Sequence, residues 1–196
     1  MPINLLKVIR TEKQPMVSMQ NRFILWTGPK HCGKTTSAVN LIQIARAEGF
    51  NVAGLLEPSL YHNSELLGFD VLDVKNQTRA PLARRKQGKR KAGSFNFFTD
   101  GLKFGNAVLN TEATKSADLI IIDEFGPLEL KNRGWRRNID SLLASSSAII
   151  LIIVRQELTS TVRKLYADVP FRELAATEKK SIDEVITLLK NHYQSQ

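Results

Sequence analysis

The sequence predicts an α/β protein of three layers, in which helices cover both faces of a mostly parallel central sheet. Three observations predict this fold. Short apolar runs alternate along the chain with longer segments of helical periodicity. Two of the runs, residues 119–122 (LIII) and 148–154 (AIILIIV), are continuously apolar, as strands buried on both faces of a parallel sheet are. The longer segments repeat their apolar residues at the spacing of an amphipathic helix.

The first part of the chain predicts a strand, a helix and a second strand. Residues 22–27 (RFILWT) are a short apolar run that a glycine-containing turn follows. A helix then follows, because the next apolar residues have the i, i+3, i+4, i+7 spacing; they are Ala38, Leu41, Ile42 and Ala45. Gly49 favours the end of this helix, and residues 51–56 (NVAGLL) are the next expected strand.

Residues 57–104 are expected to extend the sheet and then to leave it. Residues 67–71 (LGFDV) alternate, which predicts a half-buried strand with Leu67, Phe69 and Val71 on one side. Because Pro, Ser and Asn precede it, we expect an antiparallel hairpin extension here. Residues 75–104 have weak periodicity and many Lys, Arg and Gly, which predicts a mobile, basic, lid-like insert. Its SFNFF segment is interpreted as a short strand that packs into the core.

The last part of the chain returns to alternating strands and helices. The two continuous apolar runs are the central strands, and a last strand is expected over residues 169–174. Helical spacing marks two helices, the first at Trp135, Ile139, Leu142 and Leu143, and the second at Leu158, Val162, Leu165 and Tyr166. Ser181 and Glu184 have the spacing of a capping box, which opens a final helix with the face Ile182, Val185, Ile186 and Leu189.

Length and composition limit the class of protein. The chain has 196 residues, which predicts one domain over residues 21–196, with residues 1–20 as an N-terminal extension. A single cysteine excludes disulfide frameworks within the chain. The longest apolar run has seven residues, too few for a transmembrane helix, and the first residues lack a secretory signal, so we expect a cytoplasmic protein. The 28 Lys and Arg against 19 Asp and Glu give a net charge of +9, which favours anionic partners.

Residues 28–36 (GPKHCGKTT) match the phosphate-loop pattern G-x-x-x-x-G-K-[ST], and they lie between a predicted strand and a predicted helix. In such a loop, backbone N–H groups and the helix N-terminus hold an anion. We expect Lys34 to reach the β and γ phosphates and Thr35 to bind Mg²⁺ through its hydroxyl. The sequence therefore predicts a nucleotide-binding site formed by Gly28, Pro29, Lys30, His31, Cys32, Gly33, Lys34, Thr35 and Thr36.

Two residues of this loop are unusual. His31 lies where many such loops have glycine, at a position whose backbone can need an unusual dihedral angle. Two interpretations stay open: a cationic imidazole contacts the phosphate, or the side chain points to solvent while its backbone N–H binds. Cys32 is interpreted as a small loop residue, and its position at a helix N-terminus predicts sensitivity to alkylation.

Asp123 and Glu124 directly follow the apolar run 119–122. They therefore lie at the carboxyl edge of the predicted sheet, where open α/β sheets bind ligands. This is a Walker B arrangement, in which the aspartate holds the Mg²⁺ shell and the adjacent glutamate orients or deprotonates the attacking water. The sequence predicts Lys34 and Glu124 as the catalytic residues, Thr35 and Asp123 as the metal ligands, and Mg²⁺ as the cofactor.

The segments GPKHCGKTT, VAGLLEP, LGFDVLD, RAPLARR and ADLIIIDEFGPLEL together resemble a known family. It is the small P-loop nucleoside triphosphatase family that includes the cancer-related nucleoside triphosphatase and its prokaryotic counterparts. DEFGPLEL is the most specific segment, because members look like D-E-x-G-x-M/L-E-L there. The resemblance runs from about Phe23 to Leu189, and it implies a P-loop NTPase fold and Mg²⁺-dependent hydrolysis of ATP, GTP and other nucleoside triphosphates with loose base selectivity. In this chain Lys30 and His31 replace Pro-Gly, and Leu128 replaces a common Met.

Several basic residues lie outside the phosphate loop. Residues 84–91 carry six Lys and Arg, for which three interpretations stay open: a lid over the triphosphate, a nucleic-acid surface, or a solvated loop. Arg84 is a candidate for stabilising charge in the transition state, and Arg155 a candidate for packing on the base. No [NT]-K-x-D motif follows the strand before Arg155, which argues against strict selection of GTP.

These observations predict a monomeric Mg²⁺-dependent nucleoside triphosphatase whose partners are nucleoside triphosphates, with no membrane contact. Two alternatives stay open. One is a nucleotide or nucleoside kinase in which residues 57–105 hold an acceptor, and it would release little phosphate until that acceptor is added. The other is an RNA-associated nucleotide-binding switch that uses the basic segment, and its RNA binding would fall steeply with salt.

Overall fold

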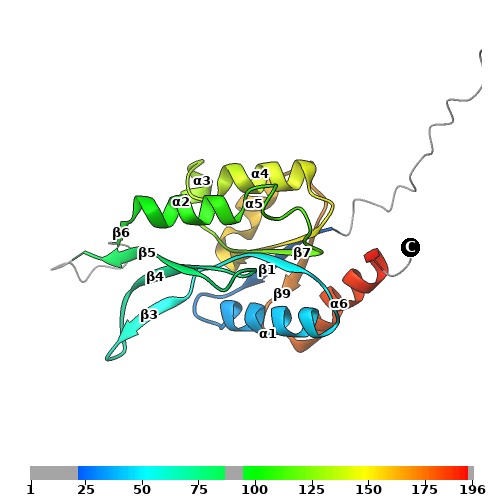
Figure 1. The fold of residues 1–196 in the computed structure, drawn as a ribbon, viewed down its shortest axis with the longest axis horizontal. Helices are drawn as coiled ribbons and strands as arrows, with labels where there is room; N and C mark the ends of the chain where they lie inside the picture. The colour runs from blue at the N-terminus through cyan, green and yellow to red at the C-terminus, as the bar shows by residue number, and fades with distance from the viewer. Residues whose placement is uncertain (1–21, 87–94, 194–196) are drawn as a thin grey trace, which may run out of the picture.

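The computed structural model describes residues 22–86 and 95–193, which form a nine-stranded sheet between two layers of helices (Figure 1). The strand order is β6-β5-β4-β2-β7-β8-β1-β9, and β3 pairs with β4. The strands are β1 (Phe23–Gly28), β2 (Val52–Leu56), β3 (Ser59–His62), β4 (Glu65–Asp73), β5 (Arg79–Arg85), β6 (Phe95–Phe97), β7 (Leu119–Phe125), β8 (Ile149–Arg155) and β9 (Phe171–Ala175). The predicted N-terminal extension lies outside the described residues.

The five strands from β2 to β9 in this order run parallel, and β3 to β6 add an antiparallel extension beside β2. The prediction of a mostly parallel central sheet with an antiparallel hairpin extension is therefore confirmed. Strands β1, β7 and β8 are apolar along nearly their whole length because both of their faces are covered. Gly54 of β2 lets this strand approach β7, since a Cβ at this position would lie 1.9 Å from the carbonyl oxygen of Ile121.

Helices cover the sheet on both sides. One layer holds α1 (Lys34–Ala47) and α6 (Lys179–Tyr193), and its core includes Leu41, Trp26 and Leu189. The other layer holds α2 (Thr99–Val108), α3 (Pro127–Leu130), α4 (Arg136–Ser145), the short helix η2 (Gln156–Leu158) and α5 (Thr159–Leu165). Within the described ranges, no helix reaches the length and apolarity that crossing a membrane requires.

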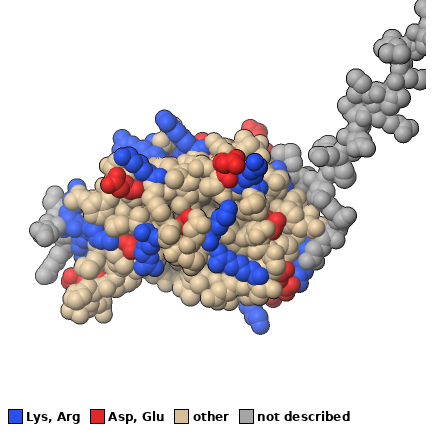
Figure 2. All heavy atoms as spheres, viewed as in Figure 1, with Lys and Arg blue, Asp and Glu red and all other residues tan. Residues whose placement is uncertain are grey.

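The structure corrects the interpretation of residues 75–104. The described part of this segment forms regular structure, because β5 and β6 pair antiparallel in the sheet and α2 begins at Thr99. The predicted strand in SFNFF is present as β6, but its packing into the core is wrong, since Phe97 and Phe98 are 44% and 42% exposed. Lys89, Arg90 and Lys91 lie outside the described residues. Lys and Arg side chains are also spread over other parts of the surface (Figure 2), so the positive charge is not confined to this segment.

Three further sequence interpretations are wrong in detail. The final helix begins at Lys179, so Ser181 is a buried residue of its first turn rather than its cap, and Glu184 pairs with Arg172. In β4 the alternation fails at Leu67, which is 42% exposed, while Asp70 on the opposite side is buried. Leu165 at the end of α5 is likewise 40% exposed. Periodicity locates these elements but does not show which of their turns the neighbouring layer reaches.

Candidate functional site

The carboxyl ends of four parallel strands meet at one edge of the sheet. Gly28 at the end of β1 lies opposite Arg155 at the end of β8, and Ile122 of β7 lies opposite Leu55 of β2. The register of β7 against β8 shifts between Ile122 and Phe125, so the ladder is interrupted at Asp123 and Glu124. This edge therefore gathers the phosphate loop, both Walker B carboxylates and the residue that follows β2, which is Glu57.

The phosphate loop occupies the predicted place between β1 and α1. Gly33 caps α1 with a φ of 87°, and His31 has a φ of 60°. Both values lie in the left-handed region, which turns successive N–H groups toward one side of the loop as an anion nest requires. The side chain of His31 is exposed. The structure thus places His31 at a position that favours glycine, with its side chain exposed.

Lys34 is the buried cation of this loop, with only 7% of its surface exposed. Its ammonium donates to the carbonyl oxygens of Gly28, at 3.2 Å, and Pro29, at 2.8 Å. The loop is packed so closely that a Cβ on Gly28 would lie 2.8 Å from the sulfur of Cys32, which is half-buried. Lys34 is therefore held inside the curve of the loop, where the phosphates of a bound nucleotide would replace neutral carbonyls as its partners.

Asp123 joins the loop to β7. The hydroxyl of Thr35 donates to its Oδ2 at 2.8 Å, and the backbone N–H of Glu57 donates to the same oxygen at 3.2 Å. Burial raises the pKa of Asp123 to about 6, against the lowering effect of these two hydrogen bonds. The two predicted metal ligands, Thr35 and Asp123, are thus in direct contact.

Glu57 is a site residue that our sequence analysis did not single out. Its Oε1 accepts a hydrogen bond from the indole Nε1 of Trp135 at 2.7 Å. Burial, and then the negative charge of Asp123, raise the pKa of Glu57 well above its usual range. The signal for it was its position directly after a predicted parallel strand, which is the same position that Asp123 has after the predicted strand 119–122.

Glu129 fixes the turn that follows the two Walker B carboxylates. It is 3% exposed, and its carboxylate accepts hydrogen bonds from the backbone N–H of Gly126, at 2.9 Å, and of Trp135, at 3.0 Å. Burial raises its pKa. The second glutamate of the segment DEFGPLEL is therefore a structural residue that holds α3 against the end of β7 and so fixes the backbone next to Glu124.

Glu124 and Arg155 face each other across the ends of β7 and β8. The Nε of Arg155 lies 2.6 Å from Oε1 of Glu124, and the two side chains are 31% and 22% exposed. The structure therefore brings together one predicted catalytic residue and one predicted nucleotide contact. In this arrangement the partner of Arg155 is the carboxylate of Glu124, whereas the sequence suggested that Arg155 packs on the base of a nucleotide.

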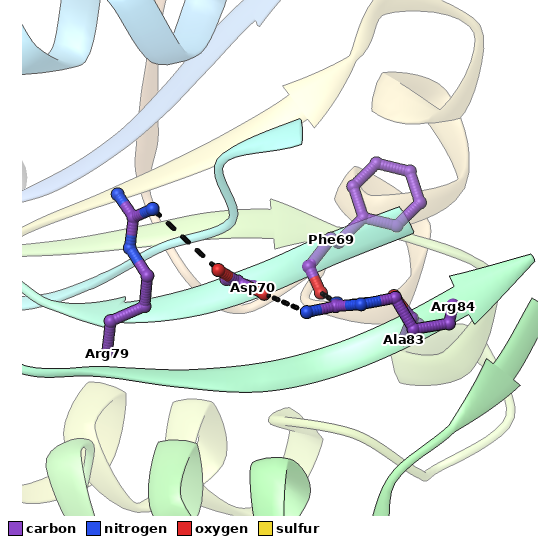
Figure 3. Close-up of polar contacts among 5 residues, drawn as sticks. All are labelled: Phe69, Asp70, Arg79, Ala83 and Arg84. Carbon is purple, nitrogen blue, oxygen red and sulfur yellow. Dashed lines mark hydrogen bonds and ion pairs between the residues drawn. The ribbon is translucent and has the colours of Figure 1, made fainter. Parts of the chain in front are cut away.

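Arg84 lies in the antiparallel extension, where it is held by the strand next to it (Figure 3). Its Nη1 donates to the carbonyl oxygens of Phe69, at 2.8 Å, and Ala83, at 2.9 Å, and its Nη2 donates to Asp70 at 2.8 Å. Arg79 reaches the other oxygen of Asp70 at 3.7 Å. The guanidinium of Arg84 thus neutralises a buried carboxylate and joins β4 to β5.

This network predicts a structural effect of Arg84. The variant Arg84→Gln should lower the free energy of unfolding by about 1–2 kcal/mol, because Asp70 stays buried with weaker partners. Its affinity for nucleotide should change little. Thermal unfolding and nucleotide binding measure the two effects, and Arg79→Gln is the matched control, with a smaller effect expected from its longer contact. An Arg84→Gln variant of unchanged stability and lost turnover would instead assign Arg84 to the reaction.

The oxygen atoms at this edge fit Mg²⁺. Mg²⁺ is bound in proteins by one or two carboxylates and keeps its remaining positions for water and substrate phosphates. Thr35 and Asp123 supply a hydroxyl and a carboxylate in contact, and Glu57 adds a second carboxylate next to Asp123. Among the residues that the structure describes, no three His, Cys, Asp or Glu side chains form a metal cluster of their own. The site therefore suits a metal that arrives with its nucleotide.

The half-buried carboxylate of Glu57 predicts a gain of stability on neutralisation. Because its pKa is raised in the folded state, the folded protein binds this proton more tightly than the unfolded chain, and stability falls as pH rises above the usual glutamate range. The variant Glu57→Gln keeps an acceptor for Trp135 and carries no charge. Without nucleotide it should melt roughly 3 °C higher at about pH 8, with little gain at about pH 4. Equal melting temperatures at both pH values would contradict this, and Glu157→Gln, at an exposed position, is the control.

Comparison with known proteins agrees with this geometry. The model of a family described as NTPase matches residues 23–187. The nucleoside-triphosphatase THEP1 of Methanothermobacter thermautotrophicus is 30% identical over 141 residues, which cover 72% of this chain and 81% of that protein. THEP1 of Caldivirga maquilingensis is 27% identical and covers 84% and 92% of the two chains.

Two solved structures share the fold. A human cancer-related nucleoside triphosphatase superposes with a TM-score of 0.65 at 21% identity, over 89% of this chain and 99% of that chain. THEP1 from the hyperthermophile Aquifex aeolicus has the same TM-score at 18% identity, over 85% and 98% of the two chains. A family match over most of the chain, the phosphate loop and the Walker B edge lead to one conclusion: the chain belongs to the NTPase family.

Proposed function

We propose that this protein hydrolyses nucleoside triphosphates to diphosphates and inorganic phosphate, with Mg²⁺ and with loose selectivity for the base. The observation that carries the proposal is the hydrogen bond of 2.8 Å between Thr35 and Asp123. It joins the phosphate loop to the Walker B strand, and we expect a nucleotide held by the loop to have its terminal phosphate beside Glu124. The names of the relatives support the same class of reaction.

The reaction assigns a task to each group of the site. Backbone N–H groups of the loop and the ammonium of Lys34 bind the phosphates and stabilise the charge that develops on them. Bound Mg²⁺ would be held by Thr35 and Asp123, and it would supply charge neutralisation to the phosphate oxygens. Glu124 orients a water molecule and accepts its proton as the water oxygen bonds to the γ phosphorus. The bond from that phosphorus to the bridging oxygen breaks, and the diphosphate leaves with the electron pair.

Selectivity for the base is expected to be loose. The strand β8 leads through Arg155 into η2, whose residues are Gln156, Glu157 and Leu158, and no guanine-reading motif lies there. A site that forms specific hydrogen bonds to its substrate discriminates by about 10⁴-fold or more. We expect far smaller differences among the four common nucleoside triphosphates.

Release of phosphate from ATP, GTP, CTP and UTP tests this proposal directly. All four should yield diphosphate and phosphate without any added acceptor, and chelation of divalent cations should stop the reaction. Phosphate that appears only after a nucleoside or nucleotide acceptor is added would identify a kinase instead. Release that continues in the presence of a chelator would contradict the assignment of Mg²⁺.

A further inference from the structure

Arg84 and Arg155 differ in how many hydrogen bonds their guanidinium groups donate within the protein. Both Nη groups of Arg84 donate hydrogen bonds within the extension, as described above (Figure 3). The side chain of Arg155 is different. Within residues 22–86 and 95–193 its ion pair is with Glu124, with Nε closest, and its Nη groups donate no hydrogen bond to the protein. Arg155 therefore has a charged fork that is free for a ligand.

The position of Arg155 directs this fork to the phosphates. Its backbone lies opposite Gly28, the first residue of the phosphate loop, in the parallel ladder of β1 and β8. Its side chain contacts Glu124, the residue to which we assign the attacking water. The backbone of Arg155 thus lies beside the start of the loop and its side chain reaches Glu124, so the guanidinium lies on the side of the site where we place the terminal phosphate of a bound nucleotide.

The ion pair with Arg155 also limits which contacts the carboxylate of Glu124 can form. One oxygen of this carboxylate is held 2.6 Å from a cation, so part of its capacity to accept hydrogen bonds from water is taken by Arg155. A terminal phosphate carries more negative charge than a carboxylate, and a guanidinium binds phosphate oxygens with two parallel hydrogen bonds. A nucleoside triphosphate would thus compete with Glu124 for Arg155. A diphosphate, which lacks the γ phosphate, would compete poorly.

We propose that Arg155 is a positioning residue that senses the γ phosphate. Without a triphosphate it pairs with Glu124 and occupies one oxygen of this carboxylate. With a triphosphate it binds the γ phosphate, and Glu124 is released to orient the attacking water. The inference deepens the proposed function and rests on it, because it requires that Glu124 serves the water in the reaction.

The variant Arg155→Met tests this role in the purified full chain. We compare affinities for ADP and for a non-hydrolysable ATP analogue, both with Mg²⁺, and the rate of a single turnover of ATP. Affinity for ADP should stay close to that of the original protein, while preference for the triphosphate falls roughly tenfold and single-turnover hydrolysis falls roughly 100-fold. Arg155→Lys keeps the charge and should recover part of the triphosphate preference.

The reciprocal variant is Glu124→Gln. Because it removes the competing carboxylate, affinity for the ATP analogue should rise, roughly fivefold, while affinity for ADP stays unchanged. In the double variant with Arg155→Met this gain should disappear, since the two residues act through one contact. A gain that persists in the double variant would contradict competition for Arg155.

Other outcomes overturn the inference in distinguishable ways. If Arg155 only restrains Glu124, hydrolysis by Arg155→Met rises. If its role is structural, the melting temperature falls and both nucleotides lose affinity equally. Arg163→Met is the matched control, because Arg163 also forms a partly exposed ion pair with a glutamate, Glu173. If the original protein does not hydrolyse nucleotides, the proposed function fails, yet the preference for triphosphate over diphosphate still tests Arg155.

Discussion

The variant Lys34→Ala is expected to lose nucleotide binding and turnover together. Lys34 is the buried cation of the phosphate loop, and without nucleotide it donates to two backbone carbonyls. Removal of a preorganised charge that contacts the transferred phosphate costs at least about 100-fold in rate. Here the ground state suffers as well, because the same ammonium neutralises the bound triphosphate. Affinity for a fluorescent triphosphate analogue and the rate of phosphate release measure the two losses.

Lys30→Ala is the matched control for this variant. Lys30 belongs to the same loop and carries the same charge, but its side chain is exposed and has no partner among the described residues. It should keep nearly the original affinity and rate. Equal losses in Lys30→Ala and Lys34→Ala would show that net charge near the loop, rather than the buried ammonium, governs binding. Nucleotide affinity that survives in Lys34→Ala would contradict the assigned role.

Glu124→Gln should separate binding from chemistry. The amide has nearly the shape of the carboxylate but cannot accept the proton of the attacking water, and loss of a general base costs about 10²–10⁴ in rate. Affinity for a Mg²⁺-bound ATP analogue should not fall, because neither Lys34 nor the contact between Thr35 and Asp123 is altered. Phosphate release in a single turnover gives the rate of the chemical step without the contribution of product release.

The control for this variant is Glu157→Gln. Glu157 is exposed in η2, two residues beyond Arg155, so it tests removal of a negative charge near the same edge of the sheet. It should turn over at the original rate. Hydrolysis that persists in Glu124→Gln at more than about a tenth of the original rate would remove Glu124 from the reaction and require another base.

The sequence locates those parts of the site that lie directly after a strand or before a helix. The phosphate loop lies between a strand and a helix, and Asp123 and Glu124 end a buried strand, because local patterns define both places. The sequence also identifies the unusual position of His31. Its φ is 60°, a left-handed conformation that glycine adopts more easily. Contacts between these segments are harder to predict from the sequence, since they depend on the order of strands in the sheet.

Glu57 and Arg155 show what the sequence alone does not supply. Glu57 becomes part of the site because β2 lies beside β7, and Arg155 meets Glu124 because β8 lies between β7 and β1. Strand order is set by the packing of the whole chain and leaves no local pattern. Arg84 gives a further example. The sequence made it a candidate for stabilising charge in the transition state, but only the pairing of β4 with β5 shows that Asp70 holds its guanidinium.

The hydrogen bond between Trp135 and Glu57 connects the fluorescence of the indole to the site. The indole is 1% exposed, and Gly105 of α2 packs so closely on its ring that a Cβ there would lie 2.3 Å from it. Indole fluorescence depends on nearby charge, and the carboxylate that accepts its N–H lies next to the proposed metal ligands. A cation that arrives with its nucleotide changes the charge around Glu57. The chain therefore carries its own optical reporter, through which occupancy of the site can be followed in real time without any label.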